Sequence, residues 1–229
     1  MTHFFSHVRL ATGLHESKEL RALMRRAGAY SDHALIWRLF PGDDVERDFV
    51  FRGLTDAREF YVVSAREPQN DSGWFQIRSK VYQPALAEGD VLHFDLRANP
   101  VVSRRTENGR SVRHDILMDT KHRLAGEGGD GAQLKEALDQ AGGEWLLKRA
   151  EQWGLEVEPA SVIQSAYTQH HLRITGKKEG KERSIRFSSL DYQGVAKVVE
   201  PDLLKKALLH GVGHAKGFGC GLLLVRRLS

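Results

Sequence analysis

A tyrosine and a histidine, Tyr30 and His33, stand three residues apart in the segment AYSDHALIWRLF. If this segment is helical, that spacing places both side chains on one face of the helix. The imidazole of histidine titrates near neutral pH, so it can accept or donate a proton in a reaction. His33 also shares its face with large apolar side chains, namely Ile36, Trp37 and Phe40. A histidine at the edge of a core is therefore the alternative, and the residue pattern alone favours it.

A glycine-rich segment near the C-terminus, residues 211–222, reads GVGHAKGFGCGL. Glycine permits positive φ angles and has no Cβ to obstruct the approach of a phosphate backbone. The backbone N–H groups of such a loop can bind phosphates, and Lys216 adds a positive charge. The sequence predicts an anion-binding loop, with a turn that serves packing alone as the alternative. Its glycines are Gly211, Gly213, Gly217, Gly219 and Gly221.

Two common nucleotide-binding motifs do not fit this segment. A dinucleotide-binding fingerprint follows a strand and opens a helix, whereas this segment follows a predicted helix and opens a strand. A Walker A loop requires Ser or Thr after its Gly-Lys pair, but Lys216 is followed by Gly217 and Phe218. The sequence excludes both.

Basic residues cluster in residues 173–186, RITGKKEGKERSIR. On charge alone, a solvated hairpin is the favoured interpretation of this run, and contact with an anionic partner is the alternative. The basic residues are Arg173, Lys177, Lys178, Lys181, Arg183 and Arg186.

The histidines do not form a metal-binding pattern. His210 and His214 are four apart, but the predicted helix ends between them, at Gly211. His170 and His171 would point to opposite faces of a strand. Without paired cysteines or clustered carboxylates, we expect neither a metal site nor another cofactor.

The elements that would position these residues repeat one plan. In the first half, strands are expected at 4–10, 48–52, 59–65 and 75–82, with helices at 16–27 and 30–40 and a polar loop at 67–73. In the second half, we expect strands at 91–102, 161–174, 184–188 and 220–225, and helices at 144–153 and 201–210. Residues 103–140 are expected to form a long, partly mobile excursion.

Each half therefore reads β-α-β-β-α-β, with the second helix of the first half degenerate. This order predicts an α+β protein of two tandem ferredoxin-like domains, residues 1–86 and 87–229, with helices on one face of each antiparallel sheet. RNA-binding modules often use such a sheet.

Composition adds further bounds. The net charge is +4, and 41% of the residues are hydrophobic, which fits an ordered chain with one medium core or two small ones. No apolar run is long enough to span a bilayer, and no signal peptide is evident. The single cysteine, Cys220, rules out an intrachain disulfide and fits the cytoplasm.

The segment HGVGHAKGFGCGLLLVRR resembles the glycine-rich signature of the RAMP superfamily of CRISPR-associated proteins, in its CasE variety. The segments LRANPVV (96–102) and RDFVFR (47–52) support the resemblance, which extends over nearly the whole chain. It implies two ferredoxin-like domains and an endoribonuclease that cleaves repeat RNA at the 3′ base of its stem-loop. It also implies that the product stays bound, together with other subunits of the Cascade complex.

The resemblance also implies roles for individual residues. It assigns the family's catalytic histidine to His33 and its tyrosine to Tyr30, and it favours catalysis over a core-edge role for His33. Tyr30 either exchanges a proton or orients the ribose. Arg38, where some relatives carry a basic residue, is a weaker catalytic candidate that could stabilise the phosphate. A hairpin of the second domain would contact the base of the RNA stem through Lys177, Lys178, Lys181 and Arg183.

Two other functions remain open. One is an RNA-binding protein of the same fold without activity, which a cleavage assay on hairpin RNA would distinguish. The other is a structural subunit of a ribonucleoprotein, whose loop only packs against a neighbour. Binding of free repeat hairpin by the isolated protein would discriminate that case.

Overall fold

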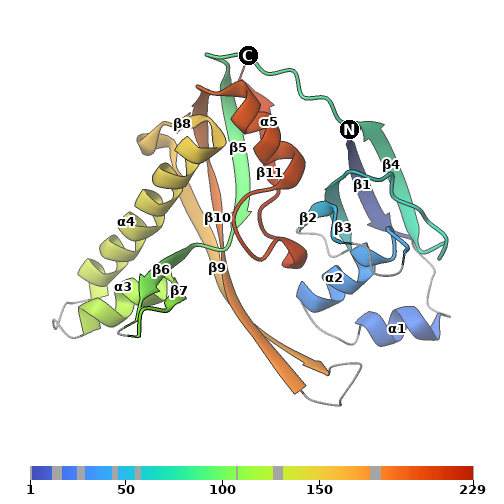
Figure 1. Ribbon diagram of the computed structural model, residues 1–229, viewed down its shortest axis with the longest axis horizontal. Coiled ribbons are helices and arrows are strands. Elements are labelled where there is room, and N and C mark those ends of the chain that lie inside the picture. The colour runs from blue at the N-terminus through green and yellow to red at the C-terminus, as the bar shows by residue number, and fades with distance from the viewer. Residues whose placement is uncertain are drawn as a thin grey trace.

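The structure is a computed structural model. It describes residues 2–11, 17–24, 29–42, 46–54, 58–106, 108–125, 131–175 and 182–228. Two antiparallel sheets lie side by side, each with helices packed on one face (Figure 1). The long hairpin of β9 (Ile163–Thr175) and β10 (Glu182–Val198) extends beyond the second sheet. Among the described residues, no helix has the length and apolar character needed to cross a membrane.

The first half of the chain forms a four-stranded sheet with the strand order β2-β3-β1-β4. Together with two helices on one face, this arrangement is ferredoxin-like, which confirms the prediction. The elements are β1 (Phe4–Leu10), α1 (Lys18–Met24), α2 (Ala29–Trp37), β2 (Phe49–Gly53), β3 (Glu59–Ser64) and β4 (Phe75–Val81).

Alternating burial along β1 shows which face of this sheet packs against the helices. Val8 and Leu10 are buried, whereas Arg9 between them is exposed. The buried face packs against Leu35 and Ile36 of α2. These two helical residues point into the core, so the other side of α2 is left to face the second domain.

The second helix of this domain is absent, as expected. Residues 65–74 are all described and contain no helix. Asn70 explains the compact loop that replaces it, because its side-chain amide donates to the Phe75 carbonyl at 2.7 Å and accepts from the Phe75 N–H at 3.1 Å. Pro68 and Gly73 in the same stretch disfavour a helix.

The second half forms a sheet with the strand order β11-β5-β10-β8, to which β9 adds by pairing with β10. If β8 and β9 are taken as one interrupted strand, this is again the ferredoxin-like order. Its main elements are β5 (Val91–Ala98), α4 (Gly131–Ala150), β8 (Leu155–Val157), β9 (Ile163–Thr175), β10 (Glu182–Val198), α5 (Pro201–His210) and β11 (Leu223–Arg227).

The predicted strand at residues 91–102 is wrong in its extent. It divides at Asn99 and Pro100, because proline has no N–H to continue a ladder and the Asn99 amide donates to the Ser188 carbonyl instead. The chain then enters β6 (Val101–Arg105), which pairs with β7 (Ser111–Asp115) outside the main sheets.

The predicted excursion at residues 103–140 is also more regular than expected. Its described part contains most of the β6–β7 hairpin, α3 (Ile116–Ala125) and the first half of α4. Asp115 begins α3 by accepting a hydrogen bond from the Met118 N–H at 2.8 Å, which is a typical N-cap contact.

The two domains meet through an apolar contact and an ion cluster, in which Arg52 pairs with Asp95 and Asp191. Val50 and Val63 of the first sheet are buried against Leu222 of the second domain. The chain passes between the sheets at residues 82–90, and the predicted boundary after residue 86 lies within this connection. The interface matters because it brings α2 next to the glycine-rich segment.

Candidate active site

His33 lies on the side of α2 that faces the second domain. Its ring is half-buried, and Nδ1 lies 2.7 Å from the carbonyl oxygen of Gly217. Since a carbonyl can only accept, Nδ1 carries the proton and donates it. A neutral ring in this tautomer leaves Nε2 unprotonated and able to accept a proton. The contact joins two residues 184 positions apart, one from each domain.

Burial dominates the electrostatics of His33. Desolvation lowers the pKa of the imidazole, the hydrogen bond to Gly217 opposes this shift, and the positive charge of Arg47 lowers the pKa further. The net pKa is below the ordinary value of 6.5. His33 is therefore mainly neutral at neutral pH in the free protein, which is the form that a general base requires.

The glycine-rich loop reverses direction tightly between α5 and β11. The Val212 N–H donates to the Gly221 carbonyl at 2.8 Å, and the Gly221 N–H donates to the Arg97 carbonyl at 2.7 Å. Gly221 has a φ of +85°, and a Cβ there would lie 2.3 Å from the Val212 carbonyl oxygen. Only glycine fits this position, so part of the glycine pattern serves packing of the loop.

Gly217 differs from the other predicted loop glycines. A Cβ on this residue would lie 3.5 Å from His33 Nδ1, which is an ordinary contact distance. Gly211, Gly213 and Gly219 have positive φ angles, and Gly213 alone of these three has open space around it. The loop thus presents the Gly217 carbonyl to His33 across the interface.

Lys216 is half-buried, and its ammonium group contacts the end of α5. Nζ donates to the carbonyls of His210 at 3.1 Å and Gly211 at 3.4 Å. These are unsatisfied carbonyls at a helix C-terminus, where a positive charge is favourable. Burial, and to a lesser extent Arg47, lowers the pKa of Lys216. Its predicted contact with RNA stays a prediction.

Tyr30 lies beside His33, as the spacing predicts. The two ring centroids are 6.1 Å apart, with an angle of 31° between the planes. Both residues therefore belong to the same face of α2, at the domain interface.

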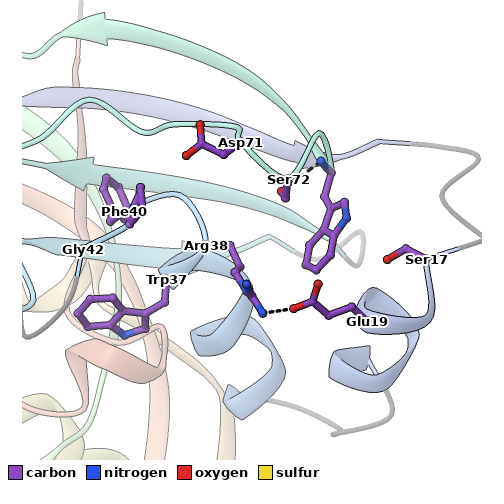
Figure 2. Close-up of a pocket in the computed structure, with 10 residues that line it drawn as sticks. Ser17, Glu19, Trp37, Arg38, Phe40, Gly42, Asp71 and Ser72 are labelled. Carbon is purple, nitrogen blue, oxygen red and sulfur yellow. Dashed lines mark hydrogen bonds and ion pairs between the residues drawn. The ribbon is translucent and has the colours of Figure 1, made fainter.

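Arg38 is directed elsewhere. Its guanidinium pairs with Glu19 of α1 and lies over the ring of Trp74, at 5.6 Å from the centroid. Figure 2 shows this pair at a pocket of the first domain that Trp37 also lines. The structure does not bring Arg38 into contact with His33, so its catalytic role stays a prediction without geometric support.

Aromatic rings continue from His33 into the second domain. Phe218 follows at 5.2 Å between centroids, then Phe187 at 5.3 Å and His170 at 4.4 Å. The last three line an open pocket of about 510 Å³ that also contains the side chains of Arg113, His171, Arg186 and His214. Sequence reasoning missed this row, although an aromatic residue between loop glycines was a possible signal.

Arg47, just before β2, is the other residue that sequence reasoning missed. Its side chain is half-buried, and Nη1 is enclosed without a hydrogen-bond partner among the described residues. Its charge acts on both His33 and Lys216. The motif RDFVFR contains Arg47, but nothing in the sequence indicates that this arginine, rather than Arg38, lies near His33.

The predicted basic hairpin lies largely outside the described residues. This holds for Lys177, Lys178 and Lys181, and for the side chains of Arg173 and Arg183. The backbones of the last two belong to the ends of β9 and β10, where Arg183 pairs with Ile174. Their RNA contacts stay predictions.

No group of three or more potential metal ligands occurs within the described ranges. His210 packs against His3, with ring centroids 5.2 Å apart. His170 stacks on Phe187 and contacts the Ser189 hydroxyl at 2.9 Å. In this part of the chain, both histidine rings are packed against other side chains.

Comparisons with known proteins agree that this chain is similar to CRISPR-associated proteins. A family model described as "CRISPR associated protein" matches residues 4–227. The CRISPR-associated endoribonuclease Cse3 of Thermus thermophilus is 28% identical over 222 residues, covering 94% of this chain and 90% of the relative. The Cascade subunit CasE of Escherichia coli is 26% identical, covering 85% and 89% of the two chains.

The fold has a similar match among solved structures. Thermus thermophilus Cse3 bound to an RNA representing a pre-cleavage complex aligns with a TM-score of 0.62 at 21% identity, covering 99% of this chain and 100% of that one. This likeness supports the ferredoxin-like fold of both domains.

Proposed function

This chain belongs to the family of CRISPR-associated proteins, and on that premise we propose that it is a metal-independent endoribonuclease that processes CRISPR precursor RNA. It cleaves within the repeat, at the 3′ base of a stem-loop, and stays bound to the mature guide RNA. The observation that carries this proposal is the contact between His33 and Gly217 at 2.7 Å, because it unites the predicted catalytic residue with the predicted RNA-binding loop.

In this mechanism, His33 acts as the general base. Nε2 accepts the proton of the ribose 2′-hydroxyl, and the 2′-oxygen attacks the adjacent phosphorus. The bond from phosphorus to the 5′-oxygen then breaks, and that oxygen takes up a proton. The products are an upstream 2′,3′-cyclic phosphate and a downstream 5′-hydroxyl. Tyr30, beside His33, either supplies the proton to the leaving oxygen or orients the ribose.

The names of the two curated relatives support this activity and its setting. One relative is an endoribonuclease, and the other is a subunit of Cascade. We therefore propose that the partners of this chain are a CRISPR repeat RNA hairpin and other Cascade subunits. The proposed compartment is the cytoplasm, which suits the free thiol of Cys220.

The test is cleavage of a CRISPR repeat hairpin by the isolated protein. We expect His33→Ala to abolish cleavage and to change hairpin affinity by less than about threefold, which is under ~1 kcal/mol. Wild-type cleavage should continue in excess EDTA and give the cyclic phosphate and 5′-hydroxyl ends. Activity that EDTA removes and Mg²⁺ or Mn²⁺ restores would contradict the proposal, as would a His33→Ala variant that cleaves at a normal rate.

A further inference from the structure

We propose that Arg47 binds the scissile phosphate and stabilises the negative charge that develops on it during cleavage. This inference rests on the function proposed above and adds a catalytic residue to it. The observations that carry it are an unpaired guanidinium nitrogen, the position of Arg47 between three segments, and the pairing of its neighbouring arginines.

Nη1 of Arg47 is a buried donor without a partner in the described part of the chain. Nearly all buried polar groups in proteins are hydrogen-bonded, and leaving a charged one unpaired is costly. The cost is tolerated at functional sites, where a ligand supplies the partner. Burial also lowers the pKa of Arg47, which is the effect of removing a cation from water without neutralising it.

Arg47 lies where α2, β2 and the glycine-rich loop come together. Only Asp48 separates it from β2, and the loop lies directly on that strand. A Cβ on Gly211 would lie 2.8 Å from the Val50 side chain, and one on Gly219 would lie 3.5 Å from Phe51. The charge of Arg47 acts on His33 from α2 and on Lys216 from the loop. The proposed base His33 and the cations Arg47 and Lys216 therefore come together from three separate segments of the chain.

Three other arginines of the first domain are paired within the described residues, Arg38 with Glu19, Arg52 with Asp95 and Asp191, and Arg66 with Asp48. Arg58 and Arg78 are exposed, whereas Arg47 is half-buried. Arg47 has no such carboxylate among those residues, so its charge is available to an external anion. This distinction also explains why Arg47, and not Arg38, fits the role of a phosphate ligand.

The ligand that suits this site is a phosphodiester. When the 2′-oxygen attacks, phosphorus becomes pentacoordinate, and its non-bridging oxygens gain negative charge. A guanidinium can donate two parallel hydrogen bonds to two such oxygens, which a point charge cannot do. A donor that is already fixed by burial needs little reorganisation during the reaction.

The experiment compares Arg47→Met with Arg47→Lys and with Arg227→Met. Methionine keeps much of the length of the side chain and removes the charge, and lysine keeps the charge without the planar fork. Arg227 is a matched control, because it pairs with Asp90 at the end of β11 farthest from the glycine-rich loop. Three quantities are measured: the single-turnover rate at saturating hairpin, the Kd for a hairpin with 2′-deoxyribose at the cleavage site, and Tm.

We expect Arg47→Met to reduce the single-turnover rate by about 10²–10³, the usual effect of losing one charge-stabilising donor. Its Kd for the uncleavable hairpin should rise by less than about tenfold. Tm should stay equal or increase, because the substitution removes an unpaired buried cation. Arg47→Lys should lose less activity, and Arg227→Met should match the wild type.

A rate for Arg47→Met within about twofold of wild type would overturn this inference, and if His33→Ala is inactive it would leave the proposed function intact. A decrease in Tm of more than ~5 °C accompanying the slower rate would also overturn it, because Arg47 would then be structural. A wild-type protein that leaves the hairpin uncut refutes the proposed function itself, whatever the variants do.

Discussion

At the scale of single residues, the chemistry of His33 depends on one carbonyl of the other domain. The bond from Nδ1 to Gly217 fixes the tautomer and leaves Nε2 as the acceptor. Burial then keeps the ring neutral by lowering its pKa. The sequence predicted the residue and its neighbour Tyr30, but it could not predict this orientation, because the carbonyl lies 184 positions away in the chain.

The lowered pKa predicts the acid limb of the pH profile. A general base must be deprotonated, so kcat/KM should rise with pH through the folded pKa of His33, with an inflection below 6.5. An NMR titration of the free protein should give the same pKa. The free energy of unfolding should depend on pH in the same direction, because the unfolded chain binds this proton more tightly than the folded chain. The stabilising contribution of neutral His33 is therefore present above about pH 6.5 and is lost as pH falls through the folded pKa.

Asp32, next to His33 in the chain, also titrates near pH 6, so its titration must be distinguished from that of His33. Burial raises the pKa of this carboxyl to about 6, and the charge of Arg97 opposes the shift. Asp32→Asn should therefore leave the inflection in place, because the variant removes only this neighbouring titration. An inflection that disappears in Asp32→Asn, or an NMR pKa for His33 above 6.5, would contradict the assignment.

The contribution of Tyr30 to the cleavage rate can be compared with that of His33. Tyr30→Phe keeps the ring that lies 6.1 Å from His33 and removes only the hydroxyl, so cleavage should slow less than in His33→Ala. Single-turnover rates of both variants on one hairpin give the order. The reverse order would make Tyr30 the primary catalytic group.

At the scale of elements, the hydrophobic period predicted the sheets and most of the helices. Strand 4–10 and helix 201–210 were predicted with the observed limits, because buried positions alternate in the first and proline begins the second. Prediction failed at the end of β5. Pro100 was a local signal that the strand ends before residue 102, but the bond from Asn99 to Ser188 joins distant residues and could not be predicted.

The loop glycines provide a matched pair for testing packing. Gly213 and Gly221 both have positive φ, at +67° and +85°, but only Gly221 lacks room for a Cβ. Gly213→Ala should cost about 1–2 kcal/mol of stability for the backbone conformation alone. Gly221→Ala should cost more, because the carbonyl of Val212 must move. Equal decreases in Tm for the two variants would contradict this explanation of the loop.

RNA binding by the basic hairpin of residues 173–186 can be tested by mutation, although several of its side chains lie outside the described residues. Changing Lys177, Lys178 and Arg183 together to alanine should weaken hairpin binding and flatten the dependence of log K on log salt. The slope should fall by roughly one to three, depending on the number of phosphates contacted. If affinity and slope both stay unchanged, the charges belong to a solvated surface.

At the scale of the whole molecule, the site exists only while the two domains keep their relative position. The catalytic base belongs to one domain and the carbonyl that orients it to the other. The tandem plan was predictable, since each half repeats one order of elements. The contact between the halves was not, because it depends on buried side chains from strands that are distant in sequence, such as Val50 and Leu222.

Arg52 provides the polar part of that contact. It projects from β2, is only 8% exposed, and pairs with Asp95 and Asp191 of the second domain. Arg52→Met should cost about 1–3 kcal/mol, because half-buried Asp95 then keeps only Gln193 as a partner, whereas Asp191 keeps two hydrogen bonds from Arg97. The control Arg104→Met removes an exposed arginine that pairs with Asp119 inside one domain. It should cost less than ~1 kcal/mol, because Arg123 stays within 3.9 Å of Asp119.

Arg52→Met should also slow cleavage more than it weakens hairpin binding. Cleavage requires His33 and Gly217 to stay in register across the interface, whereas most of the predicted RNA contacts belong to the second domain alone. Urea unfolding, single-turnover rates and hairpin Kd measure the three effects. If Arg52→Met keeps wild-type stability and rate, the ion cluster does not hold the domains together, and the apolar contact around Leu222 is sufficient to align the site.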